Sequence, residues 1–160
     1  MRITHVARRT THLSGRLSLT IAILFAVVAL GAQQPRSFKT RLSPVPIDVA
    51  MQATVAGNGT VSAVLTGAKL AVTGSFDGLK SRGTTAQLHR SAVRGVRGPS
   101  VADLVVNNTD AASGTLSGTV ELTAIQIADL EKGRLYVQLH SEKAPDGNLW
   151  GWLMPQENRR

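Results

Sequence analysis

The feature that most constrains the fold is a series of short segments in which apolar and polar residues alternate, separated by Gly, Asn, Asp and Ser. Alternation with a period of two places successive side chains on opposite faces of an extended strand. We expect strands at 52–56, 60–66, 70–76, 84–90, 101–107, 115–122, 134–141 and 148–153, with a short edge strand at 38–42. About eight short strands predict an all-β protein, an antiparallel Greek-key β-sandwich or barrel.

One short helix interrupts this pattern after residue 122. Thr123 and Gln126 have the spacing of a capping box, in which each side chain satisfies a backbone amide of the other residue. Ile127 and Leu130 supply an apolar side, and Gly133 favours termination. We therefore expect a single short helix from about 123 to 132.

Two segments carry the residues of tight turns. Asn58-Gly59 predicts a two-residue hairpin turn between 52–56 and 60–66, because Asn and Gly tolerate positive φ. The segment Ala144-Pro-Asp-Gly-Asn148 predicts the turn between the last two strands, since Pro fixes one torsion angle and Gly accepts the positive one.

The first 32 residues have the composition of a signal peptide rather than of a folded strand. Four arginines precede an apolar run from 17 to 30, which is shorter than a membrane span requires, and the small residues Ala29, Gly31 and Ala32 lie where a signal peptidase would cleave, near residue 31 or 32. An uncleaved anchor is the alternative. Removing the segment lowers the net charge from +8 to +4. We expect a signal peptide at 1–32, an extended lead-in at 33–50, one β-sandwich domain at 51–155 and a polar tail at 156–160.

The chain contains no cysteine. This excludes thiol enzymes, thiolate metal sites and cysteine-anchored lipoproteins, and it leaves sheet packing to stabilise an exported domain without disulfides. Hydrolytic chemistry also has no support. No G-x-S-x-G segment occurs, the acidic residues are scattered, and His140 and Ser141 are neighbours that point to opposite faces of a strand. We expect no enzymatic activity.

Strand parity assigns a set of polar and aromatic residues to one face. Leu88, Val137 and Leu149 belong to inward-facing sets, so their sequence neighbours point outward. If the three strands are adjacent, the outward patch contains Gln87, His89, Gln138, His140, Asn148, Trp150 and Trp152. We take these seven as the candidate ligand-binding residues.

The same strands and their connections contain a characteristic set of segments: Thr85-Ala-Gln-Leu-His89-Arg, Gly98-Pro99, Leu122-Thr123, Leu130-Glu-Lys-Gly133, Tyr136-Val-Gln-Leu-His140-Ser and Gly147-Asn-Leu-Trp-Gly-Trp-Leu153. In these segments the chain resembles the chordin-type (CHRD) domain family. The resemblance implies an exported domain whose fold is like superoxide dismutase or immunoglobulin. The departures fall on outward positions: Gln87 replaces a histidine, Gln138 an asparagine, Asn148 a glutamate, Trp150 an arginine and Trp152 a glutamine. The resemblance therefore implies a preserved scaffold with an altered or lost family site.

Two functions follow as hypotheses. In the first, the domain is a non-catalytic binding or structural module of the cell envelope or extracellular space, with an unknown protein or glycan partner that the tryptophans contact. In the second, His89 and His140 hold copper or zinc in a partly lost site, although Gln and Asn are poor ligands for these metals. We expect no cofactor under the first hypothesis, and a secreted or periplasmic location under both.

Each candidate has a plainer interpretation. The histidines could be exposed or packed on the sheet, and Trp150 and Trp152 could fill a second core layer under the helix or the lead-in. The segment 80–97 contains five cations without an acidic residue, which suits either a solvated loop or an anionic surface. No nucleic-acid motif accompanies it, so we expect no nucleic-acid partner, and membrane contact only through the signal peptide.

Overall fold

The computed structural model describes residues 34–157, and the predicted signal peptide lies outside them. The elements are β1 (Arg36–Pro44), the 3-10 helix η1 (Ala50–Ala53), β2 (Asn58–Thr66), β3 (Lys69–Asp77), β4 (Gly83–Arg90), β5 (Ser100–Asn108), β6 (Gly114–Glu121), α1 (Ala124–Glu131), β7 (Leu135–Ser141), β8 (Ala144–Trp152) and β9 (Met154–Pro155). No helix among these residues is long and apolar enough to span a membrane. The expected all-β antiparallel fold with one short α-helix is confirmed.

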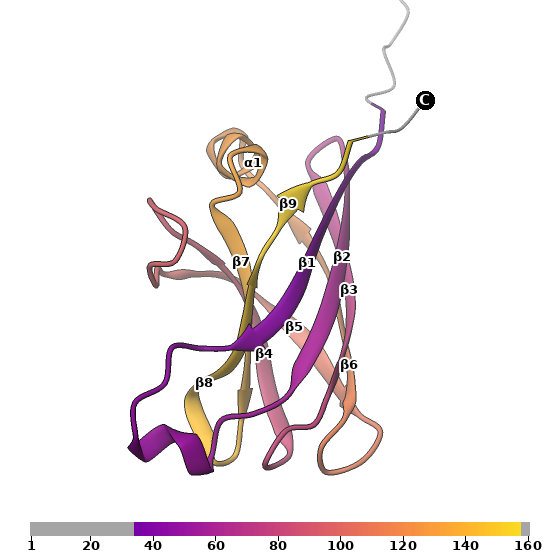
Figure 1. The fold of residues 1–160 in the computed structure, drawn as a ribbon. Coiled ribbons are helices and arrows are strands. Elements are labelled where there is room, and N and C mark those ends of the chain that lie inside the picture. The colour runs from indigo at the N-terminus through magenta and orange to yellow at the C-terminus, as the bar shows by residue number, and fades with distance from the viewer. Residues whose placement is uncertain (1–33, 158–160) are drawn as a thin grey trace, which may run out of the picture. The chain divides into compact units, whose positions relative to one another are not determined.

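The strands form a closed antiparallel barrel with one additional short strand (Figure 1). Their order is β2-β3-β6-β5-β4-β7-β8-β1, and β1 pairs with β2 to close the ring. The extra strand β9 lies beside β1 through the pairs Phe38↔Pro155 and Lys39↔Met154. Closure gives nearly every strand two neighbours, so few backbone groups remain unpaired at an edge.

The barrel interior is one apolar core built by alternation. In β2 every second residue is buried, including Val61 and Leu65, and β3 repeats the pattern with Leu70 and Val72 except at the half-buried Gly74. The inward residues of β7 and β8 complete it, and Leu139 and Leu149 lie opposite each other in register with no exposed surface. Because these residues fix which face of β7 and β8 points inward, they also fix which residues face outward.

The strand expected at 38–42 is longer and more central than an edge strand. Strand β1 pairs with β2 from Arg36 to Leu42 and then with β8 at Ser43 and Pro44. Phe38 and Leu42 are buried in the core. Part of the segment predicted as a lead-in therefore closes the barrel. Pro44 is accommodated because it lies at the strand's last position.

The predicted hairpin turn at Asn58-Gly59 is wrong. Both residues lie inside β2, paired with Asp77 and Phe76 of β3, and 50–53 form η1 instead of a strand. The position of Gly59 is explained by close approach, because a Cβ there would lie 2.4 Å from a backbone oxygen of β3. The β2–β3 turn is made at Gly67, which has φ +61°.

The predicted turn at Ala144–Asn148 is also displaced. Ser141 pairs with Ala144, which leaves only Glu142 and Lys143 to make the turn. The Pro-Asp-Gly sequence instead forms a bulge at the start of β8, where Gly147 has φ +125°. Turn-forming residues also suit a bulge that places a glycine at positive φ, as Gly147 is here, and that breaks the ladder of hydrogen bonds.

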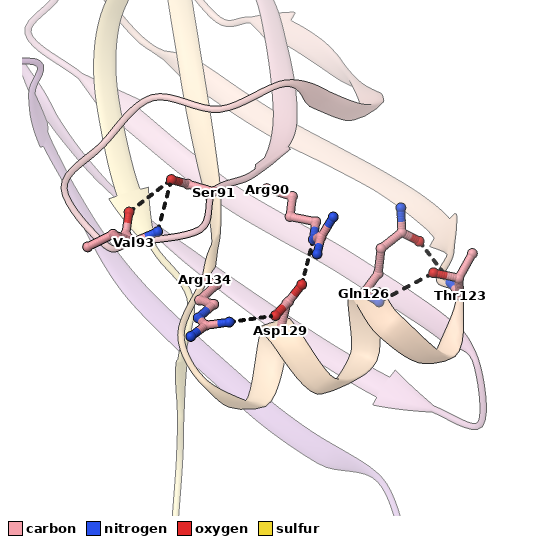
Figure 2. A network of polar contacts seen from close by, with 7 residues as sticks. All are labelled: Arg90, Ser91, Val93, Thr123, Gln126, Asp129 and Arg134. Atoms are coloured by element: carbon pink, nitrogen blue, oxygen red, sulfur yellow. Dashed lines mark hydrogen bonds and ion pairs between the residues drawn. The ribbon is translucent and has the colours of Figure 1, made fainter.

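Helix α1 lies at one end of the barrel, opposite the end occupied by η1 (Figure 1). The predicted capping box is present: Thr123 Oγ1 accepts from the Gln126 amide at 3.3 Å, and Gln126 Oε1 accepts from the Thr123 amide at 2.8 Å. Figure 2 shows this pair and the carboxylate of Asp129, which accepts from Arg90 at 2.5 Å and Arg134 at 3.2 Å. The two Asp129 contacts hold α1 against the end of β4 and the residue before β7.

Candidate binding face of strands β4, β7 and β8

The three strands expected to share a face are neighbours in the barrel wall. Strand β7 pairs with β4 on one side and with β8 on the other. Two rows of outward residues cross the strands in register: His89–Tyr136–Trp152 and Gln87–Gln138–Trp150. We call the outer surface of β4, β7 and β8 the aromatic face. The sequence prediction that the candidates from these strands lie on one side is confirmed for these rows.

The first row is a stack of rings. His89 lies almost parallel to Tyr136, with centroids 4.9 Å apart and planes 15° apart. The rings of Trp152 and Tyr136 have centroids 4.4 Å apart and planes 40° apart. The Trp150 ring contacts the rings of Tyr136 and Trp152 edge-on. Stacked and edge-on aromatic pairs each contribute about 0.5–1.5 kcal/mol beyond area burial. Tyr136, which the sequence analysis did not include among the candidates, is therefore the centre of the face.

The loop 91–99 covers part of this stack. The Gly98 amide donates to the Tyr136 hydroxyl at 3.0 Å, and the Gly98 carbonyl oxygen accepts from His89 Nδ1 at 2.9 Å. A Cβ at Gly98 would lie 1.9 Å from the Arg90 carbonyl oxygen, so only glycine allows this approach. Tyr136 is fully buried, whereas His89 and both tryptophans are half-buried.

The bulge of β8 supplies carbonyl groups to the other end of the face. Between the pairs Leu139↔Leu149 and Ser141↔Ala144, one residue of β7 faces four of β8. Gln138 Nε2 donates to the Asp146 carbonyl oxygen at 3.1 Å, and His140 Nδ1 contacts the Pro145 carbonyl oxygen at 2.7 Å. Gln138 is buried and His140 is half-buried.

Two of the seven candidate residues, Gln87 and Asn148, form hydrogen bonds with residues outside β4, β7 and β8. Gln87 Nε2 donates to the Asp103 carboxylate of β5 at 2.7 Å. Asn148 is fully buried, and its Oδ1 accepts from the Ala56 amide at 3.1 Å. Asn148 therefore fastens the segment after η1 to β8 and does not face solvent, because the chain between β1 and β2 covers it.

Trp150 belongs partly to a second, smaller core. Val45, Val55 and Ala144 form a buried cluster against which Met51 and Trp150 pack. This confirms for Trp150 the plainer interpretation, in which the segment before β2 covers the tryptophan. Both tryptophans nevertheless retain partial exposure.

Both histidines have the same tautomer. A backbone carbonyl oxygen can only accept a hydrogen bond, so the contacts of His89 and His140 require a proton on Nδ1 in each ring. In a neutral imidazole Nε2 then carries a lone pair. His89 Nε2 is buried without a hydrogen-bond partner among the described residues, and His140 Nε2 lies 3.5 Å from Gln138 Nε2.

The environment favours the neutral form of His89. Burial lowers its pKa below the ordinary value of 6.5, and the positive charges of His140 and Arg97 lower it further, while the bond to Gly98 acts in the opposite direction. The two rings face the same side of one sheet, as the sequence analysis required.

Metal-ligand residues do not gather further on this face. Among residues 34–157 no group of three or more His, Cys, Asp or Glu side chains is placed to hold an ion. Besides the two Nε2 atoms, the groups that could coordinate a metal here are side-chain amides. The Gln138 Oε1 atom is buried without a hydrogen-bond partner among the described residues.

The cationic segment 80–97 does not form one patch. Lys80 and Arg82 precede β4, and Arg94 and Arg97 follow it, so the eight residues of the strand separate them. Arg90 is bonded to Asp129. Of the cations at the two ends of β4, only those that follow the strand, Arg94 and Arg97, lie near the aromatic face.

A sequence model of the family described as CHRD domain matches residues 38–153, which is more than two thirds of the chain. The protein belongs to the CHRD domain family. Neither the curated proteins nor the solved structures contain a match to the chain. The matched segment begins within β1 and ends just before β9, so the family unit and the closed barrel coincide.

Proposed function

We propose that this protein is an exported, non-catalytic binding module, and that its ligand surface is the aromatic face. The observation that carries the proposal is the row His89–Tyr136–Trp152, in which the central ring is buried and the two outer rings remain half-exposed. Such rings offer rigid contact area at a low cost in side-chain entropy.

The chemistry beside the rings favours a neutral, hydroxyl-rich ligand such as a glycan. His140 is half-buried, and in a neutral imidazole bonded through Nδ1 the Nε2 atom is a hydrogen-bond acceptor; the other unused acceptors, His89 Nε2 and Gln138 Oε1, are buried and become available only if neighbouring side chains move. A ligand hydroxyl can donate to His140 Nε2 while the apolar side of a sugar packs on a tryptophan ring. A cationic ligand is disfavoured because the charge of Arg97 acts on His89.

Calorimetric titration of the domain with neutral oligosaccharides of different linkage tests the proposal. We expect one class to bind and Trp152→Ala to weaken it at least tenfold, because the substitution removes the outer ring of the stack. Ile125→Ala, at an exposed apolar residue of α1, is the matched control and should leave the affinity unchanged. Equal affinities of wild type and Trp152→Ala would contradict the proposal.

A copper or zinc site is the second candidate, and the shared tautomer of His89 and His140 favours it. Hydrogen bonding of Nδ1 to a carbonyl oxygen is the arrangement that orients metal-binding histidines through Nε2. Gln138 would supply the third donor, which is weak for either metal. Titration with Cu⁺ and Zn²⁺ should then show one equivalent bound in the wild type and none in His89→Gln or His140→Gln. Absence of stoichiometric binding by the wild type would exclude the site.

A further inference from the structure

Arg90 and the loop 91–99 form an open cavity beside the aromatic face, and Gly98, which contacts His89 and Tyr136, belongs to its wall. The cavity has a volume of about 360 Å³ and lies between the loop and the end of β4. Arg90 and Arg97 line it together with the apolar side chains of Val93, Val96 and Pro99, and no acidic residue contributes to its wall. This size falls within the range of small-molecule sites.

The two guanidinium groups have donors to spare. Arg90 uses Nε to bind Asp129, and no described residue accepts from its two terminal nitrogens. Arg97 donates through one terminal nitrogen to the Asp146 carbonyl oxygen. Figure 2 shows the Arg90 side chain extending to the Asp129 carboxylate of α1, with the Ser91–Val93 turn that opens the loop to its left. Paired terminal nitrogens of arginine match the two oxygens of a carboxylate.

The local charge is positive even after the ion pairs are counted. Asp129 is shared between Arg90 and Arg134, so one carboxylate faces two guanidinium groups, and Arg97 adds a third cation. Val93 and Val96 remain 62% and 56% exposed. Apolar side chains beside an excess of positive charge complement a ligand with a negative head and a short apolar chain.

We propose that this cavity binds a small organic carboxylate, with Arg90 and Arg97 contacting the carboxylate and Val93 and Val96 contacting the chain. The site differs from the proposed glycan surface in both ligand charge and residues. It also gives the cationic residues that follow β4 a specific role, in place of general attraction to anionic surfaces.

Titration of the isotope-labelled domain with hexanoate, followed through the backbone amide signals of residues 91–98, tests the proposal. Hexanol serves as the neutral match and inorganic phosphate as the anion without a chain. We expect hexanoate to bind best and Arg97→Gln to weaken it about tenfold, because one charge-assisted contact is lost. Arg82→Gln, an equal change of charge before β4, should have little effect.

Arg90→Lys keeps the positive charge beside Asp129 but removes the forked donor pair, so it should also weaken hexanoate binding while the domain stays folded. Any of three results would overturn the proposal. The first is that the signals of residues 91–98 do not change with hexanoate at about 10 mM, which corresponds to negligible affinity. The second is that hexanol or phosphate binds as well as hexanoate, and the third is that the wild type and Arg97→Gln bind hexanoate with equal affinity.

Discussion

His89 on β4 lies directly opposite Tyr136 on β7, and their rings stack at 4.9 Å while both contact Gly98 of the covering loop. This relationship joins the barrel wall to the loop 91–99. The Tyr136 ring is buried, and the His89 Nε2 atom is buried without a hydrogen-bond partner among the described residues. Gly98 therefore joins both the Tyr136 hydroxyl and the His89 ring to the covering loop.

The first prediction concerns pH. The pKa of His89 is lower in the folded protein than its ordinary value of 6.5, so the unfolded chain binds the proton more readily. The resulting stabilisation is fully present above pH 6.5 and is lost as the pH falls through the folded pKa. Urea unfolding at pH 7.5 and 5.5 should show a larger loss of stability in the wild type than in His89→Gln. Equal losses in the two proteins would show that His89 does not titrate in this way.

The second prediction separates the Tyr136 ring from its hydroxyl group. Tyr136→Phe keeps the stack but removes the acceptor of the Gly98 amide, at a cost of about 1 kcal/mol. Hydrogen exchange should accelerate at the Gly98 amide. The Ser91 amide, which donates to the Arg134 carbonyl oxygen, is the internal control and should not change. An unaltered rate at Gly98 would mean that another group holds the loop.

The third prediction concerns the β8 bulge. Gly147 has φ +125°, and a Cβ there would lie 2.4 Å from Gln138 Nε2, so Gly147→Ala combines backbone strain with a clash and should cost about 2–4 kcal/mol. Gly67 has φ +61° but open space around an added Cβ. Gly67→Ala should therefore lower the free energy of unfolding by about 1 kcal/mol, from backbone strain alone. Thermal or urea unfolding measures both. Similar costs would show that Gln138 can move aside.

The fourth prediction compares two carboxylates of α1. Asp129 is buried and bonded to Arg90 and Arg134, whereas Glu131 forms a half-exposed pair with Arg36. Asp129→Asn should lower the free energy of unfolding by about 1–2 kcal/mol, and Glu131→Gln by less than about 0.5 kcal/mol, because exposed pairs contribute little.

The pH dependence of Asp129 has its own window. The bond from Arg90 holds the pKa of Asp129 below its ordinary value of 3.8, so its contribution to stability is present above that value and is lost as the pH falls through the folded pKa. The Asp129→Asn variant should therefore show a weaker loss of stability below pH 4 than the wild type. An equal loss would assign acid unfolding to other carboxylates.

Strand parity was the part of the sequence that predicted most. The alternation of Leu135, Val137 and Leu139 placed Tyr136, Gln138 and His140 on the opposite side. The register confirms the rows that Tyr136 and Gln138 form with β4 and β8, whereas His140 lies at the bulge and has no register partner. The capping box at Thr123 was likewise readable, because it depends on residues three positions apart. Both signals are local, and the structure preserves them.

Contacts between distant segments could not be read in this way. The covering of Tyr136 by Gly98 and of Asn148 by Ala56 depends on where loops return to the barrel, which side-chain alternation does not specify. Turn chemistry misled for a related reason. Asn58-Gly59 and Pro145-Asp-Gly147 have turn-forming residues, but tertiary packing uses them for close strand approach and for a bulge.

The proposal that the aromatic face binds a ligand is tested most directly by the indole signals of the chain, because Trp150 and Trp152 are its only two tryptophans. Nuclear magnetic resonance spectra of the labelled domain, recorded with the oligosaccharide that binds in calorimetry, report on both side chains at once. We expect the Trp152 indole signal to shift in a saturable manner together with the side-chain signals of His140. Saturable shifts confined to β2, β3 and β6, with both indole signals unmoved, would contradict the account.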